Sequence, residues 1–327
     1  MFTVNTSEMA ILLCVLTMIG WGSWANTQKL AGKEQWPFEL FYWDYAIGIF
    51  LISLILGHTM GSTTNDANSL VNNIHSADLS NVLWTMVGGA IFNLANLLLV
   101  AAIAMAGLAV AFPLSIGIAL VVGVVLSYIL QPIGNLPLLA GGVLCALIAV
   151  IMIGKAYGSL VSAGKSVSRK SVITCIVSGV LMGLWAPFVA RAMTHGNKLG
   201  PYSIAIFLTL GALLSCAIWN VYFMKHPLVG EPVSFSGFFR GPLSGHMLGL
   251  LGGIIWGVGM VFNLVAANFT GVAISYAIGQ SAPMVAALWG IFAWKEFKGG
   301  GSKATMYLIL MFVFYGLAIA LVAKANG

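Results

Sequence analysis

Long runs of apolar residues alternate with short polar segments along the whole chain. Ten of these runs reach the length of about 20 residues that a helix needs to cross a bilayer. Their predicted ranges are 9–29, 38–57, 82–105, 108–130, 136–154, 172–193, 201–223, 246–269, 271–293 and 304–323. Because the apolar residues are continuous and do not alternate with polar ones, the runs favour helices over membrane β-strands. The pattern predicts an all-α integral membrane protein with ten transmembrane helices.

The composition excludes a soluble protein. The 327-residue chain is 60% hydrophobic and 7% charged, whereas a soluble domain carries about a quarter charged residues. Lipid must therefore cover most of its surface. The four cysteines, which each stand alone in an apolar run, are expected to be small packing residues rather than disulfides or metal ligands. The five histidines show no metal-binding spacing, so we expect no metal, no cofactor and no enzymatic activity.

The sequence repeats itself at an offset of about half its length. Gly88-Gly89 opens the third predicted span and Gly252-Gly253 opens the eighth. Each copy would hold five spans, and because five is odd the second copy enters the membrane from the opposite side, as in alternating-access carriers. We predict two inverted five-helix repeats, 1–154 and 172–327, joined by a cytoplasmic loop at 155–171. Chance similarity among glycine-rich apolar helices is the alternative.

The basic residues predict the orientation, because Lys and Arg gather in cytoplasmic loops. If the N-terminus lies outside, the basic residues on the inner side are Lys29, Lys33, Lys155, Lys165, Arg169, Lys170, Lys225, Arg240, Lys295, Lys298 and Lys303. Those on the outer side are then only Arg191, Lys198 and Lys324. We therefore expect both termini outside, in the inner or plasma membrane of the cell.

Polar and aromatic side chains inside the apolar runs point to a buried cavity, since an unpartnered polar group in lipid costs several kcal/mol. Trp21, Trp24 and Gln28 share one helix face. Aromatic faces and carboxamide edges suit a neutral polyhydroxyl or heterocyclic solute. The residues predicted to bind it are Trp21, Trp24, Gln28, Asn93, Asn96, Trp185, Trp256, Asn263, Tyr276 and Gln280. The alternatives are a tryptophan belt at the membrane surface and amides that bond one helix to another.

Asp44 is the acidic residue that lies furthest inside a predicted span, about 9 Å deep at 1.5 Å per residue. Burial in lipid disfavours the charged form of a carboxylate, and such a group can carry a proton. We therefore predict a proton-coupling role for Asp44, with Lys29 as its neighbour. The alternatives are a structural salt bridge from Asp44 to Lys29, across the turn at 30–37, and direct contact with the solute.

Several sequence blocks resemble the drug/metabolite transporter superfamily. They are Gly20-Trp21-Gly22-Ser23-Trp24, residues 39–45, residues 96–113, residues 252–257 and Leu288-Trp289-Gly290. The branch they resemble most holds glucose/ribose porters, ureide permeases and rhamnose–proton symporters. The resemblance implies a ten-helix, inverted-repeat secondary carrier for sugars, or for ureides and nucleobases, that is often driven by protons.

Two features depart from that pattern. Plant ureide permeases have a long central loop with a motif like a phosphate-binding loop. Here the central loop is short, and Gly158 and Gly164-Lys165 are misspaced for such a motif, so nucleotide binding is excluded. Many members of the superfamily are drawn with both termini inside, whereas the charge distribution of this chain favours both outside.

The scarcity of charge within the spans predicts a neutral solute. We predict a secondary active transporter that imports a small neutral polar solute, a monosaccharide in the first place, by proton symport and alternating access. The alternatives are a ureide or nucleobase permease, a multidrug or metabolite exporter, and a non-transporting receptor or scaffold, for which no loop is long enough. Its partners would be the solute and the lipid bilayer, without nucleic acid, and the proton would be the coupling ion.

Overall fold

The computed structural model describes residues 1–33, 36–62, 69–106, 108–160 and 168–326, without the side chains of 103–104, 106, 108–110 and 112–113. The first half of the chain forms α1 (Ser7–Ser23), α2 (Ala25–Lys33), α3 (Phe38–Met60), α4 (Leu70–Ser76), α5 (Leu79–Ala106), α6 (Leu108–Leu130) and α7 (Leu136–Gly158). The second half forms α8 (Arg169–Thr194), α9 (Pro201–Ser215), α10 (Trp219–Lys225), α11 (Phe235–Phe239), α12 (Leu243–Thr270), α13 (Val272–Gly279), α14 (Ala282–Phe292) and α15 (Gly301–Ala325). The predicted all-α class is confirmed.

Nine helical segments among the described residues are long and apolar enough to cross a membrane, and each of them lies on one of the predicted spans. The remaining predicted span, 108–130, is α6, whose described apolar stretch, Leu114–Leu130, is shorter than the others. The chain is therefore a multi-pass integral membrane protein, and the count of ten spans stays a prediction. The central connection is shorter than predicted, because α7 continues to Gly158 and α8 begins at Arg169.

Three of the spans are not continuous helices. The first is divided at Trp24 into α1 and α2, the seventh at 216–218 into α9 and α10, and the ninth at Gln280 and Ser281 into α13 and α14. Pro283 lies in the first turn of α14, where the lack of a backbone N–H does no harm. Two of these breaks, at Trp24 and at Gln280, lie on the wall of the cavity that is described below.

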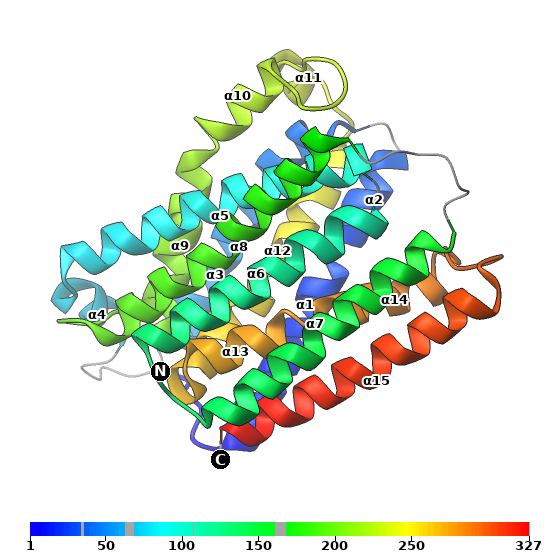
Figure 1. Ribbon diagram of the computed structural model, residues 1–327. Helices are drawn as coiled ribbons and strands as arrows, with labels where there is room; N and C mark the ends of the chain where they lie inside the picture. Colours follow the sequence, from blue (N-terminus) through cyan, green and yellow to red (C-terminus); the bar gives the residue numbers. More distant parts are fainter. Residues whose placement is uncertain (34–35, 63–68, 107, 161–167, 327) are drawn as a thin grey trace.

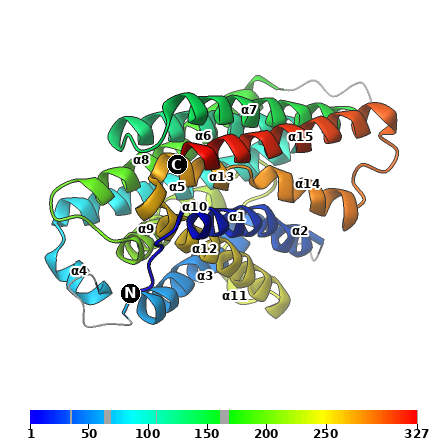
Figure 2. The ribbon, with the colours of Figure 1, turned by 90° about the horizontal axis from the view of Figure 1, so that it is seen from below.

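The packing partners of the two halves correspond. In one set of contacts α12 packs against α1 and α3, and in the other α5 packs against α8 and α9. The two sets correspond when α1 is exchanged with α8, α3 with α9 and α5 with α12. The last helices of the halves, α7 and α15, pack along each other, and Figures 1 and 2 show them side by side at one face of the bundle.

Glycines allow two of these helix pairs to touch backbone to backbone. A Cβ atom at Gly89 of α5 would overlap the carbonyl oxygen of Leu208 in α9. A Cβ atom at Gly253 of α12 would overlap the carbonyl oxygen of Tyr45 in α3 in the same way. Gly89 and Gly253 are the residues that matched in the sequence repeat, so the repeated motif marks two equivalent helix crossings.

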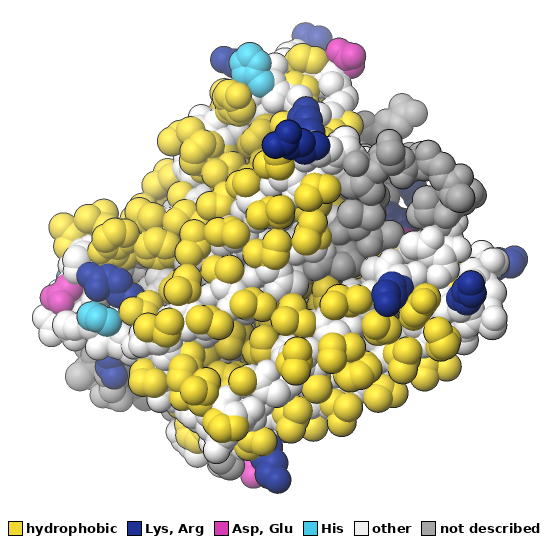
Figure 3. Space-filling model, in the orientation of Figure 1, with side chains coloured by type: hydrophobic (Ala, Val, Ile, Leu, Met, Phe, Trp, Pro, Cys, Tyr) yellow, Lys and Arg dark blue, Asp and Glu magenta, His cyan; other side chains and the backbone are white. Residues whose placement is uncertain are grey.

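The surface has the pattern that a membrane requires. Figure 3 shows hydrophobic side chains over the middle of one face, with charged side chains gathered toward its ends. Both chain termini lie at one end of the bundle, and α10 and α11 lie at the other (Figure 1). The end that carries α11 also holds Lys33, Lys155 and Lys225, at or near the last residues of their helices, and is called the basic end below.

Candidate functional site

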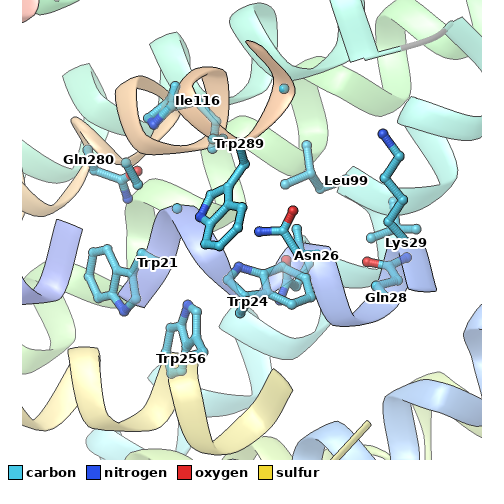
Figure 4. A pocket seen from close by; sticks show the side chains of 18 of the residues that line it. Trp21, Trp24, Asn26, Gln28, Lys29, Leu99, Ile116, Trp256, Gln280 and Trp289 are labelled. Carbon is cyan, nitrogen blue, oxygen red and sulfur yellow. The ribbon is translucent and has the colours of Figure 1, made fainter. Parts of the chain in front are cut away.

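A cavity of about 180 Å³ lies inside the bundle, and the helices that surround it come from both halves of the chain. It begins among buried side chains at Trp21 and Trp256, which are 8% and 5% exposed. It ends toward the basic end, near Gln28 and Lys29. Figure 4 shows this arrangement, with Trp21 and Trp256 at one end, Gln28 and Lys29 at the other, and Trp289 between them.

Stacked aromatic rings close the buried end of the cavity. Trp256 of α12 stacks on Phe92 of α5 with 4.5 Å between ring centroids, and on Trp21 of α1 with 5.6 Å and an angle of 11°. Trp185 of α8 meets Trp21 edge-on at 6.0 Å. The four rings come from four helices and from both halves, so this aromatic layer connects elements that would move relative to each other in a carrier.

Carboxamide groups lie at several points along the otherwise mostly apolar wall, on Asn26, Gln28, Asn96 and Gln280. The Asn26 amide is held in place, because its Nδ2 donates to the carbonyl of Ser23 at 2.7 Å and its Oδ1 accepts from Nε1 of Trp294 at 2.5 Å. Gln280 lies in the break between α13 and α14. Each carboxamide offers both a donor and an acceptor, and together with the indole faces they can hold a small, flat, polar molecule.

An ion pair lies at the exposed end of the cavity, which is called the mouth below. Nζ of Lys29 in α2 bonds Oε1 of Glu296, which follows α14, and the two side chains are 41% and 25% exposed. The Tyr157 hydroxyl of α7 donates to Oε2 of the same carboxylate at 2.9 Å. The Lys29 ammonium also lies 4.4 Å from the ring centroid of Trp294. Three segments of the chain are thus linked across the mouth by polar contacts.

Most of the predicted site residues come together at this cavity. Those that line it are Trp21, Trp24, Gln28, Lys29, Asn96, Trp185, Trp256 and Gln280. They lie in five different helices and in two helix breaks, at sequence separations of up to more than 200 residues. Their role in binding stays a prediction.

Three predicted site residues lie away from the cavity wall and bond between helices. Asn93 Nδ2 donates to Ser215 Oγ at 3.0 Å, Asn263 Nδ2 donates to the Ser275 carbonyl at 2.9 Å, and the Tyr276 hydroxyl donates to the Met182 carbonyl at 3.0 Å. All three are buried. This is the helix-to-helix bonding that the sequence left open as the alternative role for such residues.

Asp44 does not form the predicted alternative contact with Lys29. Its carboxylate oxygens lie 2.9 and 3.0 Å from Nδ1 of His246 in α12, and Nε2 of His246 lies 3.0 Å from the carbonyl oxygen of Phe238 in α11. The expected Asp44–Lys29 salt bridge is wrong because α12 packs against α3 at this level, whereas Lys29 faces Glu296 across the mouth. Asp44 also does not line the cavity.

Sequence reasoning missed several residues of the wall, chiefly Asn26, Tyr157, Trp289, Trp294 and Glu296. Asn26 comes two residues after Trp24 in the sequence, and helical spacing alone does not distinguish it from a lipid-facing residue. The predicted ninth span ends at 293, so Trp294 and Glu296 fall in the connection beyond it. The available signal was the local density of tryptophan and charge in 289–296, but the same composition is typical of a membrane interface.

The chain is similar in sequence and in fold to known proteins. The Ureide permease family model matches residues 41–174 and 165–325. Ureide permease 1 of Arabidopsis thaliana is 22% identical over 100% of this chain and 99% of its own. A protein described as a candidate sugar uptake protein, from Lactiplantibacillus plantarum, is 26% identical over 52% of this chain and 55% of its own. A solved crystal structure with 17% identity covers 96% of this chain and 98% of its own, with a TM-score of 0.62, and shows the same fold.

Proposed function

Because the chain belongs to the ureide permease family, we propose that it is a membrane permease that carries a ureide, or a similarly flat polar heterocycle, by alternating access. The observation that supports this most is the cavity, where indole faces and carboxamide edges converge. A ureide contains planar N–C(=O)–N groups, whose faces can stack on indole rings and whose N–H and C=O groups point outward in the same plane. The wall offers partners for both.

A monosaccharide, the solute that the sequence put first, has weaker support. Its hydroxyl groups point in all directions and each needs a partner when water is removed, whereas most of the wall is aromatic or aliphatic. The similarity to the bacterial protein described as a candidate for sugar uptake covers half of the chain. An exporter of lipophilic cations would favour an unpaired carboxylate in the cavity, and Glu296 is paired with Lys29.

A ligand panel tests the solute class. Purified protein should gain thermal stability with allantoin and uracil and should not gain it with xylose or glucose, because a ligand at 100 times its Kd stabilises the folded state by about 2.7 kcal/mol. Counterflow of labelled allantoin in proteoliposomes should follow the same order. Stabilisation and counterflow by the sugars alone would overturn the ureide assignment and restore the sugar.

The proposed transport cycle uses two inverted halves, 1–154 and 172–327, joined by the segment 155–171. The corresponding contacts of α5 and α12 and the equivalent crossings at Gly89 and Gly253 support this arrangement. In this arrangement the protein lies in the inner or plasma membrane of the cell. Its basic end faces the cytoplasm, and both termini lie outside. The cavity then lies on the inner side, with the Lys29–Glu296 pair across its mouth, and rocking of one half against the other would open it to the outside.

The Lys29–Glu296 pair should act as a lock across the mouth, with a modest effect because both side chains are partly exposed. We expect Lys29→Glu to reduce counterflow about two- to fivefold, since an exposed pair contributes up to about 1 kcal/mol. The double variant Lys29→Glu with Glu296→Lys should recover most of the loss. Lys33→Glu on the same helix is the control. Adding Glu296→Lys should not recover any loss of counterflow that Lys33→Glu causes. Equal counterflow of both single variants and the wild type would contradict a lock.

We also propose that transport is coupled to protons and that Asp44 and His246 hold the coupling proton. Both ring nitrogens of His246 face acceptors, the Asp44 carboxylate and the Phe238 carbonyl. If Nε2 donates to the carbonyl, the pair contains one further proton, shared between Nδ1 and the carboxylate. Such a pair is neutral overall with either partner protonated, which allows it to lie inside the membrane.

Asp44→Asn should abolish solute-driven proton uptake in proteoliposomes and leave counterflow within about twofold of wild type, because exchange requires no net proton movement. The carboxamide keeps the shape of the side chain, so the packing of α3 on α12 is retained. Glu39→Gln, which removes an acid near the start of the same helix, is the matched control and should keep proton uptake. If Asp44→Asn still takes up protons with solute, the pair is a structural link between α3, α11 and α12.

A further inference from the structure

Two hollows on the outside of the bundle, apart from the cavity, meet at Lys155. The first is a polar hollow at the basic end, between the end of α7 and the start of α15, and Lys155, Ser159, Ser302 and Lys303 line it. The second is an apolar groove between α6 and α7, and its lining also ends at Lys155. Lys155 is the one residue that the two linings share among the described residues.

The polar hollow is positively charged. Two exposed lysines, Lys155 and Lys303, line it, and none of its described lining residues is acidic. The ammonium of Lys155 lies 5.8 Å from the ring centroid of Tyr307 in α15, so its charge is directed toward this hollow. The first turn of the 25-residue helix α15 also borders it, and no side chain of the described residues caps that helix. Its free N–H groups add to the positive potential of the two lysines.

The apolar groove faces the lipid. Two of its residues, Val121 of α6 and Ile151 of α7, are 36% and 51% exposed. Gly117 contributes to its depth, because the nearest atom to a Cβ at this position would be Cδ2 of Leu147, at 3.5 Å. Gly154, one residue before Lys155, also lacks a side chain. The groove is therefore apolar along its length. It begins beside the ammonium groups of Lys155 and Lys303 and runs parallel to the membrane-spanning helices.

We propose that the polar hollow and the apolar groove together bind one anionic phospholipid. The phosphate lies between Lys155 and Lys303 and accepts hydrogen bonds from them, from the Ser302 hydroxyl and from the start of α15. One acyl chain lies in the groove between α6 and α7. The position of the lysines at the ends of spanning helices matches the level of lipid headgroups, and basic pockets between spanning helices are known sites for anionic headgroups. The lipid would connect α6, α7 and α15.

Titration of delipidated protein with phosphatidylglycerol and phosphatidylcholine, followed by native mass spectrometry and melting temperature, tests the proposal. We expect one phosphatidylglycerol to bind and to raise the melting temperature more than phosphatidylcholine. The double variant Lys155→Gln with Lys303→Gln should bind it on the order of 20-fold more weakly, since each lysine near an anionic lipid contributes about a factor of five. The matched control, Lys225→Gln with Arg240→Gln, removes two exposed charges at the same end and should bind as wild type.

Gly117→Leu fills the groove without changing charge and should also weaken phosphatidylglycerol binding. Inorganic phosphate and glycerol 3-phosphate separate the headgroup from the lipid and should give little stabilisation. Three outcomes would overturn the proposal: equal binding of the two lipids, wild-type binding by the Lys155/Lys303 double variant, and stabilisation by free phosphate as large as that by the lipid. Wild-type binding by Gly117→Leu would reject the groove as the place of the acyl chain.

Discussion

Replacing Trp256 with alanine is expected to weaken binding of the transported solute by on the order of tenfold to a hundredfold. Trp256 stacks on both Phe92 and Trp21 and forms the centre of the aromatic layer at the buried end of the cavity. Truncating a tryptophan at the centre of a binding site costs about 2 kcal/mol or more, and each 1.4 kcal/mol is a factor of ten in affinity. The measurement is the Kd for allantoin by isothermal titration of purified protein, with counterflow as a second readout.

Loss of stability must be separated from loss of the binding surface, because a buried Trp→Ala change itself destabilises a protein by about 3–5 kcal/mol. Trp256→Phe keeps an aromatic face and should retain most of the affinity. Trp43→Ala is the matched control, since Trp43 is partly buried against Phe235 and does not line the cavity, and should lower the melting temperature without changing the Kd. Wild-type affinity of a folded Trp256→Ala protein would rule out this end of the cavity as the binding site.

Valine at either glycine crossing, Gly89→Val or Gly253→Val, is expected to prevent a stable fold. The first added carbon would overlap the carbonyl oxygen of Leu208 or Tyr45, and these are backbone atoms that cannot rotate away. Overpacking costs about 1–3 kcal/mol where side chains can adjust, and more where the backbone must move. Monodisperse yield after size exclusion in detergent and the melting temperature are the measurements. Both variants should fall well below wild type.

Gly316→Val is the control for these two variants, because nothing in the described chain lies within 4 Å of a Cβ at that position. It changes the same residue type inside a spanning helix and should have a wild-type yield. Since the two crossings are equivalent, Gly89→Val and Gly253→Val should have effects of similar size. A stable Gly253→Val protein would show that α3 and α12 do not pack as closely as described, and would remove a main support for the inverted repeat.

The fold was largely predictable because the length of an apolar run is fixed by the thickness of the bilayer. The predicted span 82–105 became α5, Leu79–Ala106, and the span 108–130 became α6 with the same bounds. The breaks at Trp24 and at 216–218 were not predictable, since neither contains proline. They depend on a local side-chain bond, from Thr27 Oγ1 to the Trp24 carbonyl, and on tertiary contacts such as the bond from Asn93 to Ser215.

The candidate site was half predictable. Polar and aromatic side chains inside apolar runs identified Trp21, Gln28 and Gln280, because such residues are costly in lipid unless they have a use. The ionic contacts were not predictable. Asp44 pairs with His246 and Lys29 with Glu296 across separations of more than 200 residues, and sequence proximity suggested Lys29 as the partner of Asp44. Only the packing of α12 on α3 and of the segment after α14 on α2 determines these pairs.

The ion pair at the mouth has a consequence for how the two resting conformations respond to their surroundings. The offset that relates Gly89 to Gly253 places the counterparts of Lys29 and Glu296 near 192–193 and 132–133, where the residues are Ala, Met, Pro and Ile. The opposite entrance would thus have no matching ion pair at these positions and would seal mainly through apolar contacts. Added salt weakens attraction between exposed charges, whereas cooling weakens apolar burial. High ionic strength should therefore shift the resting population toward the conformation whose inner entrance is open, whereas low temperature should shift it the other way, toward the conformation whose outer entrance is open.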